Sequence, residues 1–188
     1  MGLDMYLSRK KYVGANYEHR KVKGEIKINI GERELPIDFN KVTYIEEEVG
    51  YWRKANQIHK WFVDNVQDGV DNCREHYVSL EKLKELLEIC KTVKEKAVLE
   101  VGKIKNGKQL VDGKFVPVFE EGRTIVNAEE IKELLPTADG FFFGGTDYDE
   151  WYMQDIENTI KILEEIVEDE EKMNKEGVYC DYYYQSSW

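Results

Sequence analysis

Hydrophobic and polar positions alternate in the first part of the chain in a way that predicts strands. Residues 1–7 and 21–30 carry apolar side chains at every second position, which is the pattern of a half-buried strand. The Gly-Glu-Arg turn at residues 31–33 precedes a returning segment at 35–39, where Pro36 favours an edge strand. This pattern therefore predicts a short strand followed by an antiparallel hairpin.

Three later segments carry apolar residues at helical spacing. A first helix is expected to begin between residues 43 and 51 and to end at residue 66, with an apolar stripe at 52, 55, 58, 62 and 66. Ser79 is a suitable N-cap for a second helix over residues 80–98. Thr146 and Asp149 form a capping-box-like start for a long third helix that ends near residue 172.

A strand-like pattern separates the second and third helices. Residues 100–126 contain two turn dipeptides, Asn106-Gly107 and Asp112-Gly113, between short apolar runs, so we expect an inserted β-hairpin here. A short helix over residues 128–135 follows, with Asn127 in the N-cap position.

The C-terminal part is rich in aromatic residues. Residues 139–145 predict an apolar strand that enters a glycine turn, and residues 178–184 predict a tyrosine-rich strand. The tail at 185–188 is expected to dock on the domain as a strand, and a subunit or partner interface is the alternative. Residues 1–188 are thus expected to form one compact α+β domain, with about three main helices packed on short antiparallel strands and hairpins.

Charge narrows the classes of partner. The net charge is −11, and residues 147–176 alone hold twelve acidic residues against three lysines, a net of −9. Generic binding to a nucleic-acid backbone is not expected, because cations supply most of that affinity. The acidic segment is either a solvated helix face or a surface that docks on a basic partner.

Apolar run lengths argue against a membrane partner. No run approaches the ~20 residues that a membrane span needs, and the N-terminus lacks a signal-peptide core. Three cysteines at irregular spacing do not form a disulfide framework, which agrees with a cytoplasmic location.

Catalytic and metal motifs are missing from the sequence. The chain has neither a Gly-x-Ser-x-Gly elbow nor a His-Glu-x-x-His motif, and no lysine follows the glycines of Gly144-Gly145-Thr146. A metal set could be drawn from Cys73, His76 and His59, but it lacks a second paired motif. We therefore expect no enzyme activity, no metal and no cofactor.

Residues 51–62 are the most distinctive stretch for binding. They hold two tryptophans, a phenylalanine, a histidine and three cations. Arginine next to aromatic residues is typical of interface hot spots and of sites that stack a ring and hold a phosphate. A simpler interpretation is that the aromatic residues are core and the polar ones are solvated. The candidate ligand- or partner-binding residues are Trp52, Arg53, Asn56, Gln57, His59, Lys60, Tyr148, Trp151 and Trp188.

Four motifs carry a resemblance to known sequences. They are MGLDMYL at residues 1–7, YWRKAN with IH and WF at 51–62, GFFFG at 140–144 and QSSW at 185–188. With these motifs the chain resembles a family of small proteins encoded by phages and prophages of bacteria, largely Gram-positive ones. The hairpin at 100–126 departs from shorter members. The resemblance implies a phage setting, in the cytoplasm of an infected or lysogenic host, and supplies no catalytic residue.

These observations lead to three functional hypotheses. The first is a non-enzymatic phage accessory protein, an anti-defence inhibitor of the anti-CRISPR kind, which contacts a host defence protein through acidic and aromatic surfaces. The alternative is a small-molecule binder that sequesters a host nucleotide signal with Trp52, Arg53 and Asn56. The third is an enzyme that processes nucleotides or nucleic acid, which requires an acid–base or metal cluster. The sequence leaves a homo-oligomer open.

Overall fold

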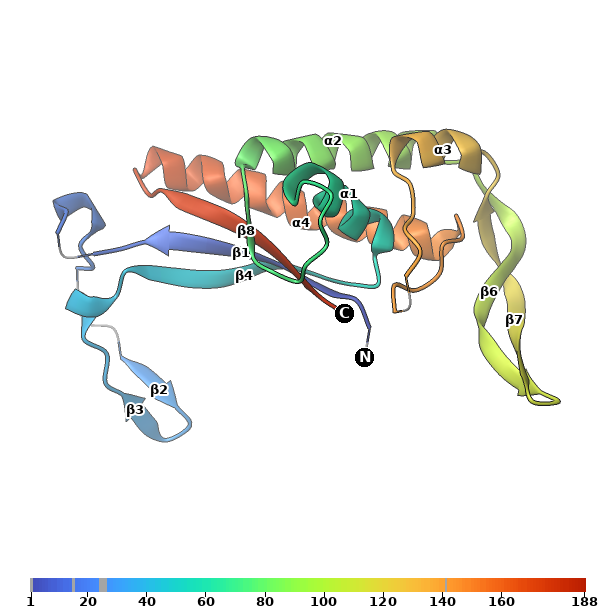
Figure 1. Cartoon of the computed structure of the whole chain (residues 1–188). Coiled ribbons are helices and arrows are strands. Elements are labelled where there is room, and N and C mark those ends of the chain that lie inside the picture. The colour runs from blue at the N-terminus through green and yellow to red at the C-terminus, as the bar shows by residue number, and fades with distance from the viewer. Residues whose placement is uncertain (1, 15, 24–26, 141) are drawn as a thin grey trace.

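A four-stranded antiparallel sheet forms the base of the structure, with the helices over one of its faces (Figure 1). The computed structural model describes residues 2–14, 16–23, 27–140 and 142–188. The strand order is β4-β1-β8-β5, with bounds of Tyr44–Arg53, Asp4–Tyr12, Cys180–Ser187 and His76–Val78. The first and last strands of the chain are therefore the two central ones. The expected docking of the C-terminal segment as a strand is confirmed by its pairing with β1.

Four α-helices lie on the same side of this sheet (Figure 1). They are α1 over Asn56–Val66, α2 over Leu80–Lys96, α3 over Ala128–Leu134 and α4 over Glu150–Lys175. Two short 3-10 turns, Glu18–Arg20 and Phe39–Lys41, lie in the segment between β1 and β4. The expected α+β class is confirmed, and beside the three main helices the described residues contain α3 where a short helix was expected over residues 128–135.

The core lies between the sheet and the helices. Side chains of a strand point alternately to its two faces, so Met5, Leu7 and Arg9 of β1 face the helices while Tyr6 and Ser8 face away. The helices bury regularly spaced apolar side chains against these strands. Examples are Ile58, Phe62, Leu83, Leu86, Cys90, Ile156 and Leu163.

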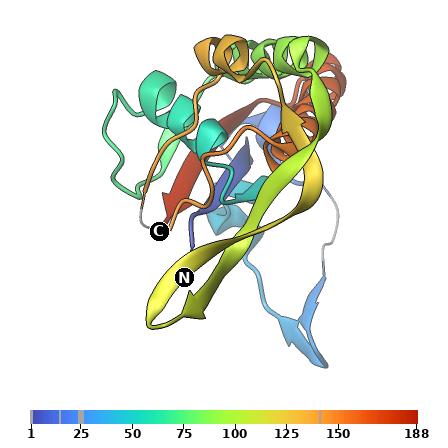
Figure 2. The same ribbon diagram turned by 90° about the vertical axis from the view of Figure 1, so that its right-hand side faces the viewer.

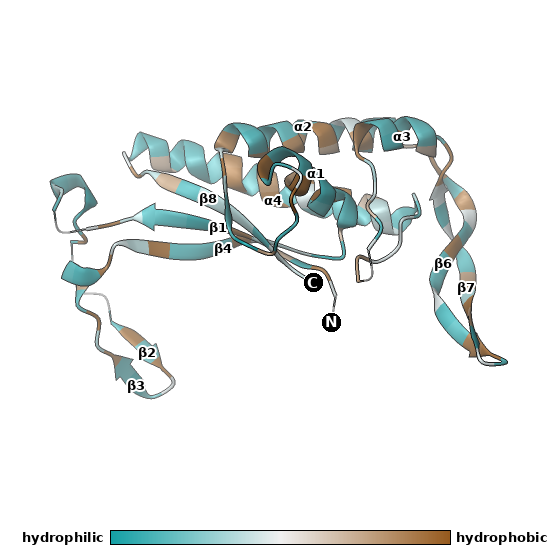
Figure 3. Cartoon of the chain, in the orientation of Figure 1, coloured by the Kyte–Doolittle hydropathy of each residue, from teal (hydrophilic) through white to brown (hydrophobic). Residues whose placement is uncertain are grey.

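Two hairpins lie outside the central sheet: one is inserted between β1 and β4, and the other connects α2 to α3 (Figures 1 and 2). The smaller pairs β2, Ile28–Ile30, with β3, Arg33–Leu35. The larger pairs β6, Leu99–Val111, with β7, Lys114–Ile125, at the place expected for an inserted hairpin. Both carry exposed apolar side chains, and the brown parts of their ribbons in Figure 3 mark hydrophobic residues.

The first helix begins later than its apolar spacing predicts, and that prediction was wrong. Residues 44–53 form β4, in which Trp52 faces the core while Tyr51 and Arg53 face away. Pairing of Met5 with Trp52 fixes this period of two, and it overrides the helical spacing. Lys54, at φ 61°, then redirects the chain into α1.

Three smaller expectations also need correction. Residues 142–149 form a loop instead of the end of an apolar strand, and Phe141 lies outside the described residues. Asp149, not Thr146, caps α4, because its Oδ1 accepts hydrogen bonds from the backbone of Trp151 and Tyr152. The expected hairpin of residues 21–30 and 35–39 is limited to Ile28–Ile30 paired with Arg33–Leu35 in the described residues, so Pro36 is not part of a strand; residues 24–26 fall outside the described residues.

Candidate functional site

The residues expected to form one site lie in different parts of the structure. Trp52 belongs to the core, where its Nε1 donates a hydrogen bond to Thr159 Oγ1 at 2.9 Å and its ring lies 6.1 Å from that of Phe62. Because the side chain is buried on the helix face of β4, Trp52 offers no surface to a partner.

Asn56 is a structural residue. Its Nδ2 donates to the carbonyl oxygens of Phe143 and Gly145, at 3.1 and 2.7 Å, and its Oδ1 accepts from the backbone N–H of Ala138 at 3.0 Å. All three bonds tie the start of α1 to the segment before α4. A ligand could bind Asn56 only by breaking this support.

His59 is also internal. Its Nδ1 lies 2.8 Å from the Tyr184 hydroxyl, and its Nε2 lies 2.9 Å from Asp71 Oδ2. The three side chains join α1, β8 and the loop before β5. A histidine between a carboxylate and a hydroxyl can belong to a catalytic site, but both His59 and Tyr184 are buried. Their arrangement stabilises the packing of α1 on the sheet.

Lys60, Tyr148 and Trp188 lie apart from one another. Lys60 forms an ion pair with Asp64, one turn along α1, at 2.7 Å. The Tyr148 hydroxyl accepts a hydrogen bond from the backbone of Thr137, and Trp188 packs edge-on against Phe143. The structure does not bring these residues into one site.

Arg53, Gln57 and Trp151 do converge, on a cleft of about 680 Å³. The cleft lies between the end of β4, the first turns of α1 and α4, the loop at residues 142–149 and part of β6. Gln57 Nε2 donates to Asp155 Oδ2 at 3.1 Å. Burial raises the pKa of Asp155 from 3.8 to about 6, against the lowering effect of this hydrogen bond. A carboxyl group perturbed in this way is a marker of functional clefts.

A second surface, which the sequence interpretation missed, covers the sheet face that points away from the helices. Cross-strand pairing gathers tyrosines from all four strands there. We call it the tyrosine face, and its six tyrosines are Tyr6, Tyr12, Tyr44, Tyr51, Tyr77 and Tyr183. Their rings meet in pairs at centroid distances of 5.4 Å (6 with 51), 6.4 Å (12 with 44) and 6.0 Å (77 with 183).

Lys10 lies at the centre of the tyrosine face. Its Nζ is 4.2 Å from the ring centroid of Tyr183 and 5.4 Å from that of Tyr44, and it forms an ion pair with Glu75. The hydroxyl of Tyr12 lies 3.3 Å from that of Tyr183. These contacts hold the rings in defined positions, although Tyr44, Tyr51 and Tyr77 remain 44%, 41% and 57% exposed. The signal in the sequence was tyrosine alternating with core residues, as in Met5-Tyr6-Leu7.

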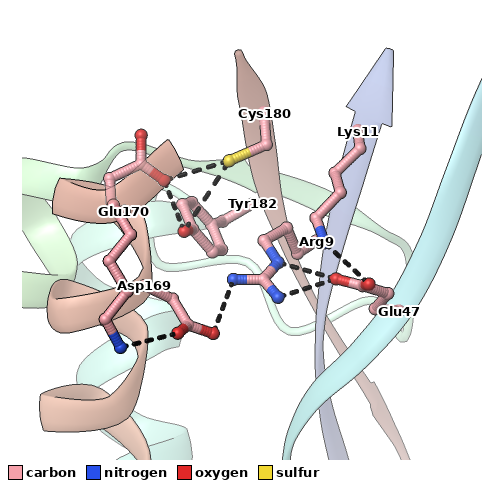
Figure 4. A network of polar contacts seen from close by, with 8 residues as sticks. Arg9, Lys11, Glu47, Asp169, Glu170, Cys180 and Tyr182 are labelled. Atoms are coloured by element: carbon pink, nitrogen blue, oxygen red, sulfur yellow. Dashed lines mark hydrogen bonds and ion pairs between the residues drawn. The ribbon is translucent and has the colours of Figure 1, made fainter. Parts of the chain in front are cut away.

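A network of ion pairs fixes the sheet to α4 on the helix side (Figure 4). Arg9 binds Glu47 of β4 at 2.7 Å and Asp169 of α4 at 3.3 Å. Next to it, the Tyr182 hydroxyl and the Cys180 thiol donate to Glu170, at 2.7 and 3.0 Å. Burial, together with Glu170, raises the pKa of Cys180 to about 11, so the thiol stays protonated and unreactive.

Within the described residues, no cluster of three or more His, Cys, Asp or Glu side chains is arranged to hold a metal ion. The same residues include no helix with the length and apolar character needed to cross a bilayer. Comparison of the chain with protein-family models, curated proteins and solved structures found no match.

Proposed function

We propose that this chain is a binding protein that docks a basic protein partner on its tyrosine face. The observation that carries the proposal is the gathering of six tyrosines on a sheet face over which the described residues place no helix. Exposed aromatic groups of this extent usually mark interaction sites, because soluble proteins rarely leave large apolar patches in water.

Tyrosine has the physical properties that a protein interface needs. It offers a large contact area with few rotatable bonds, and its hydroxyl can bond to a partner or to water. With about 4.8 Å between strands and about 3.4 Å per residue, the strands β4, β1 and β8 and the three-residue β5 give a face of roughly 500 Å². That area is more than half of the ~800 Å² that each partner contributes to a standard interface.

Charge favours a basic partner. The register places four acidic residues and two cations on the tyrosine face, which gives a net of 2 − 4 = −2. They are Asp4, Glu46, Glu48 and Asp181, with Lys10 and Arg53. The whole chain carries −11, so it repels acidic partners and attracts basic ones at long range.

The resemblance to phage proteins points to a class of partner: a defence protein of the bacterial host. A host defence protein that binds nucleic acid must present a basic surface. An acidic, tyrosine-rich face is suited to covering such a surface, as an anti-CRISPR-like inhibitor would. Inhibition would then arise from occupying the surface, without any reaction.

Differential capture from host lysate tests this proposal. We would compare the wild type with a Tyr51→Ser/Tyr77→Ser variant and with a Tyr17→Ser/Tyr179→Ser control, whose tyrosines are exposed and belong to none of the four strands of the sheet. The expected result is a basic protein that the wild type and the control retain and the face variant loses. If the face variant retains the same proteins as the wild type, the proposal is wrong.

A further inference from the structure

The cleft is lined by four cationic side chains from separate parts of the chain. Arg53 ends β4, Lys54 follows it, and Lys105 and Lys108 belong to β6. Four carboxylates line the cleft too, so its cations are not outnumbered, whereas the whole chain has a net charge of −11.

A β-bulge directs the two hairpin lysines to the same side. Lys105 and Lys108 would point to opposite faces of a regular strand, because side chains alternate. Lys105 pairs with Phe119 and Lys108 with Pro117, and these two partners lie two residues apart on β7. The extra residue, next to Gly107 at φ 82°, therefore brings both lysines to one face.

Among the described residues, two of the four cations form no ion pair. Lys105 forms an ion pair with Asp147 at 3.0 Å, and Arg53 lies 3.9 Å from Asp4. Over the part of the chain that the structure describes, Lys54 and Lys108 form no ion pair with a carboxylate. Positive charge at the cleft is thus available to an anion from solution.

Acidic residues line the cleft as well, but most are engaged within the protein. Asp149 accepts the N-cap hydrogen bonds of α4, Asp147 is paired with Lys105, and Asp155 accepts the hydrogen bond from Gln57. Asp139 is exposed. Hydrogen bonds from neutral donors leave the charge on Asp149 and Asp155, so the four cations and four carboxylates of the lining balance, and the groups open to an added anion are Lys54 and Lys108, which the described residues leave unpaired.

Two neutral groups complete the cleft. Trp151 is 49% exposed although it sits in the first turn of α4, so its ring is free for a flat partner. Gln57 is buried and uses Nε2 to bind Asp155, while its Oε1 accepts no hydrogen bond from the described residues. An unpaired acceptor on a residue that lines the cleft is a hydrogen-bonding position for a ligand N–H.

We infer that this cleft binds a small anion that carries an aromatic ring, with nucleotides as the chemical class. The phosphates would lie among the four cations, the ring against Trp151, and an exocyclic amine or ring N–H toward Gln57. The volume of about 680 Å³ lies within the roughly 300–1,000 Å³ of typical ligand sites. The site shares Arg53 with the tyrosine face but uses none of its tyrosines, so the tyrosine variants proposed above leave Lys54, Lys105, Lys108 and Trp151 of the cleft unchanged.

Calorimetry and thermal unfolding with defined probes test the inference. The probes are ATP, GTP, CTP and UTP, with adenosine as a ring without phosphate and tripolyphosphate as an anion without a ring. At least one nucleotide should bind more tightly than either half-ligand. Because bound ligand stabilises the folded state, that nucleotide should also raise the unfolding temperature.

Matched variants locate the site. Lys108→Gln should weaken nucleotide binding by roughly tenfold, and Trp151→Ala by a similar factor. Lys114→Gln is the control, because it removes the same charge from the same hairpin outside the cleft. Absence of binding by all four nucleotides at millimolar concentration overturns the inference. So does equal binding by Lys108→Gln and the wild type, while equal affinity for tripolyphosphate excludes the role given to the ring.

Discussion

Replacement of Asp155 by Asn tests the electrostatics of the cleft. The amide has the shape of the carboxyl group and keeps an oxygen that can accept the hydrogen bond from Gln57 Nε2. Asp155 is desolvated, and burial raises its pKa from 3.8 to about 6. Above that pH the folded protein must hold a charge that burial disfavours.

The magnitude follows from the two pKa values. Their separation corresponds to about 3 kcal/mol of unfolding free energy at pH 8, and partial exposure of the side chain reduces this to roughly 1–3 kcal/mol. Because the folded state binds the proton more tightly, this group stabilises the fold least at high pH. The penalty disappears as the pH falls from about 6 through 4. We therefore expect Asp155→Asn to be more stable than the wild type at pH 8 and nearly equal to it close to pH 3.5.

Urea unfolding at pH 8 and near pH 3.5 measures this difference. A gain of 1–3 kcal/mol corresponds to a rise of about 2–12 °C in unfolding temperature for a chain of this length. Asp139→Asn, at an exposed position of the same cleft, is the control and should change stability little at either pH. If Asp155→Asn destabilises the protein at pH 8, or changes stability equally at both pH values, the assignment of a desolvated carboxyl is wrong.

Three further predictions concern single side chains. Asn56→Ala should lower the free energy of unfolding by about 2–4 kcal/mol, because three backbone groups lose their hydrogen-bond partner. Urea unfolding measures this change, and a loss below about 1 kcal/mol would contradict the supporting role of Asn56. Gly144→Ala should cost about 1–2 kcal/mol, because φ is 93° and the added Cβ would lie 3.1 Å from Lys54 Cβ, whereas Gly145→Ala, with open space, should cost less. Cys180 should resist alkylation by iodoacetamide at pH 8 in the folded protein and react in urea, since its pKa is raised to about 11 in the folded state. Mass spectrometry measures the alkylation, and rapid alkylation of the native thiol would refute this prediction.

Local patterns predicted those parts of the fold that depend on neighbours in sequence. Ser79 begins α2 as expected, since its side chain accepts a hydrogen bond from the Lys82 backbone. The Asp112-Gly113 turn closes the large hairpin, but Asn106-Gly107 forms a bulge, because continued pairing of β6 with β7 outweighs its turn preference. Only tertiary pairing distinguishes these two similar dipeptides.

The candidate sites, like the fold, could be predicted only where they depend on residues that are close in sequence. Arg53, Gln57 and Trp151 line one cleft, but they come from a strand and two different helices. The periodicity of one segment therefore cannot predict that they meet. Asn56 and His59 have the polarity of ligand-binding residues, yet they satisfy internal groups. The tyrosine face depends on the strand order β4-β1-β8-β5, which joins the two ends of the chain and cannot be read from local periodicity.

The binding role of the tyrosine face is tested most directly by titration calorimetry with the purified partner from the differential capture. We predict that Tyr51→Ser/Tyr77→Ser weakens binding by roughly 30-fold or more, because buried tyrosines are frequent hot spots. Binding should also weaken as salt is raised. Tyr17→Ser/Tyr179→Ser should bind like the wild type. Equal affinities of the face variant and the wild type would contradict the proposal that this face is the docking surface.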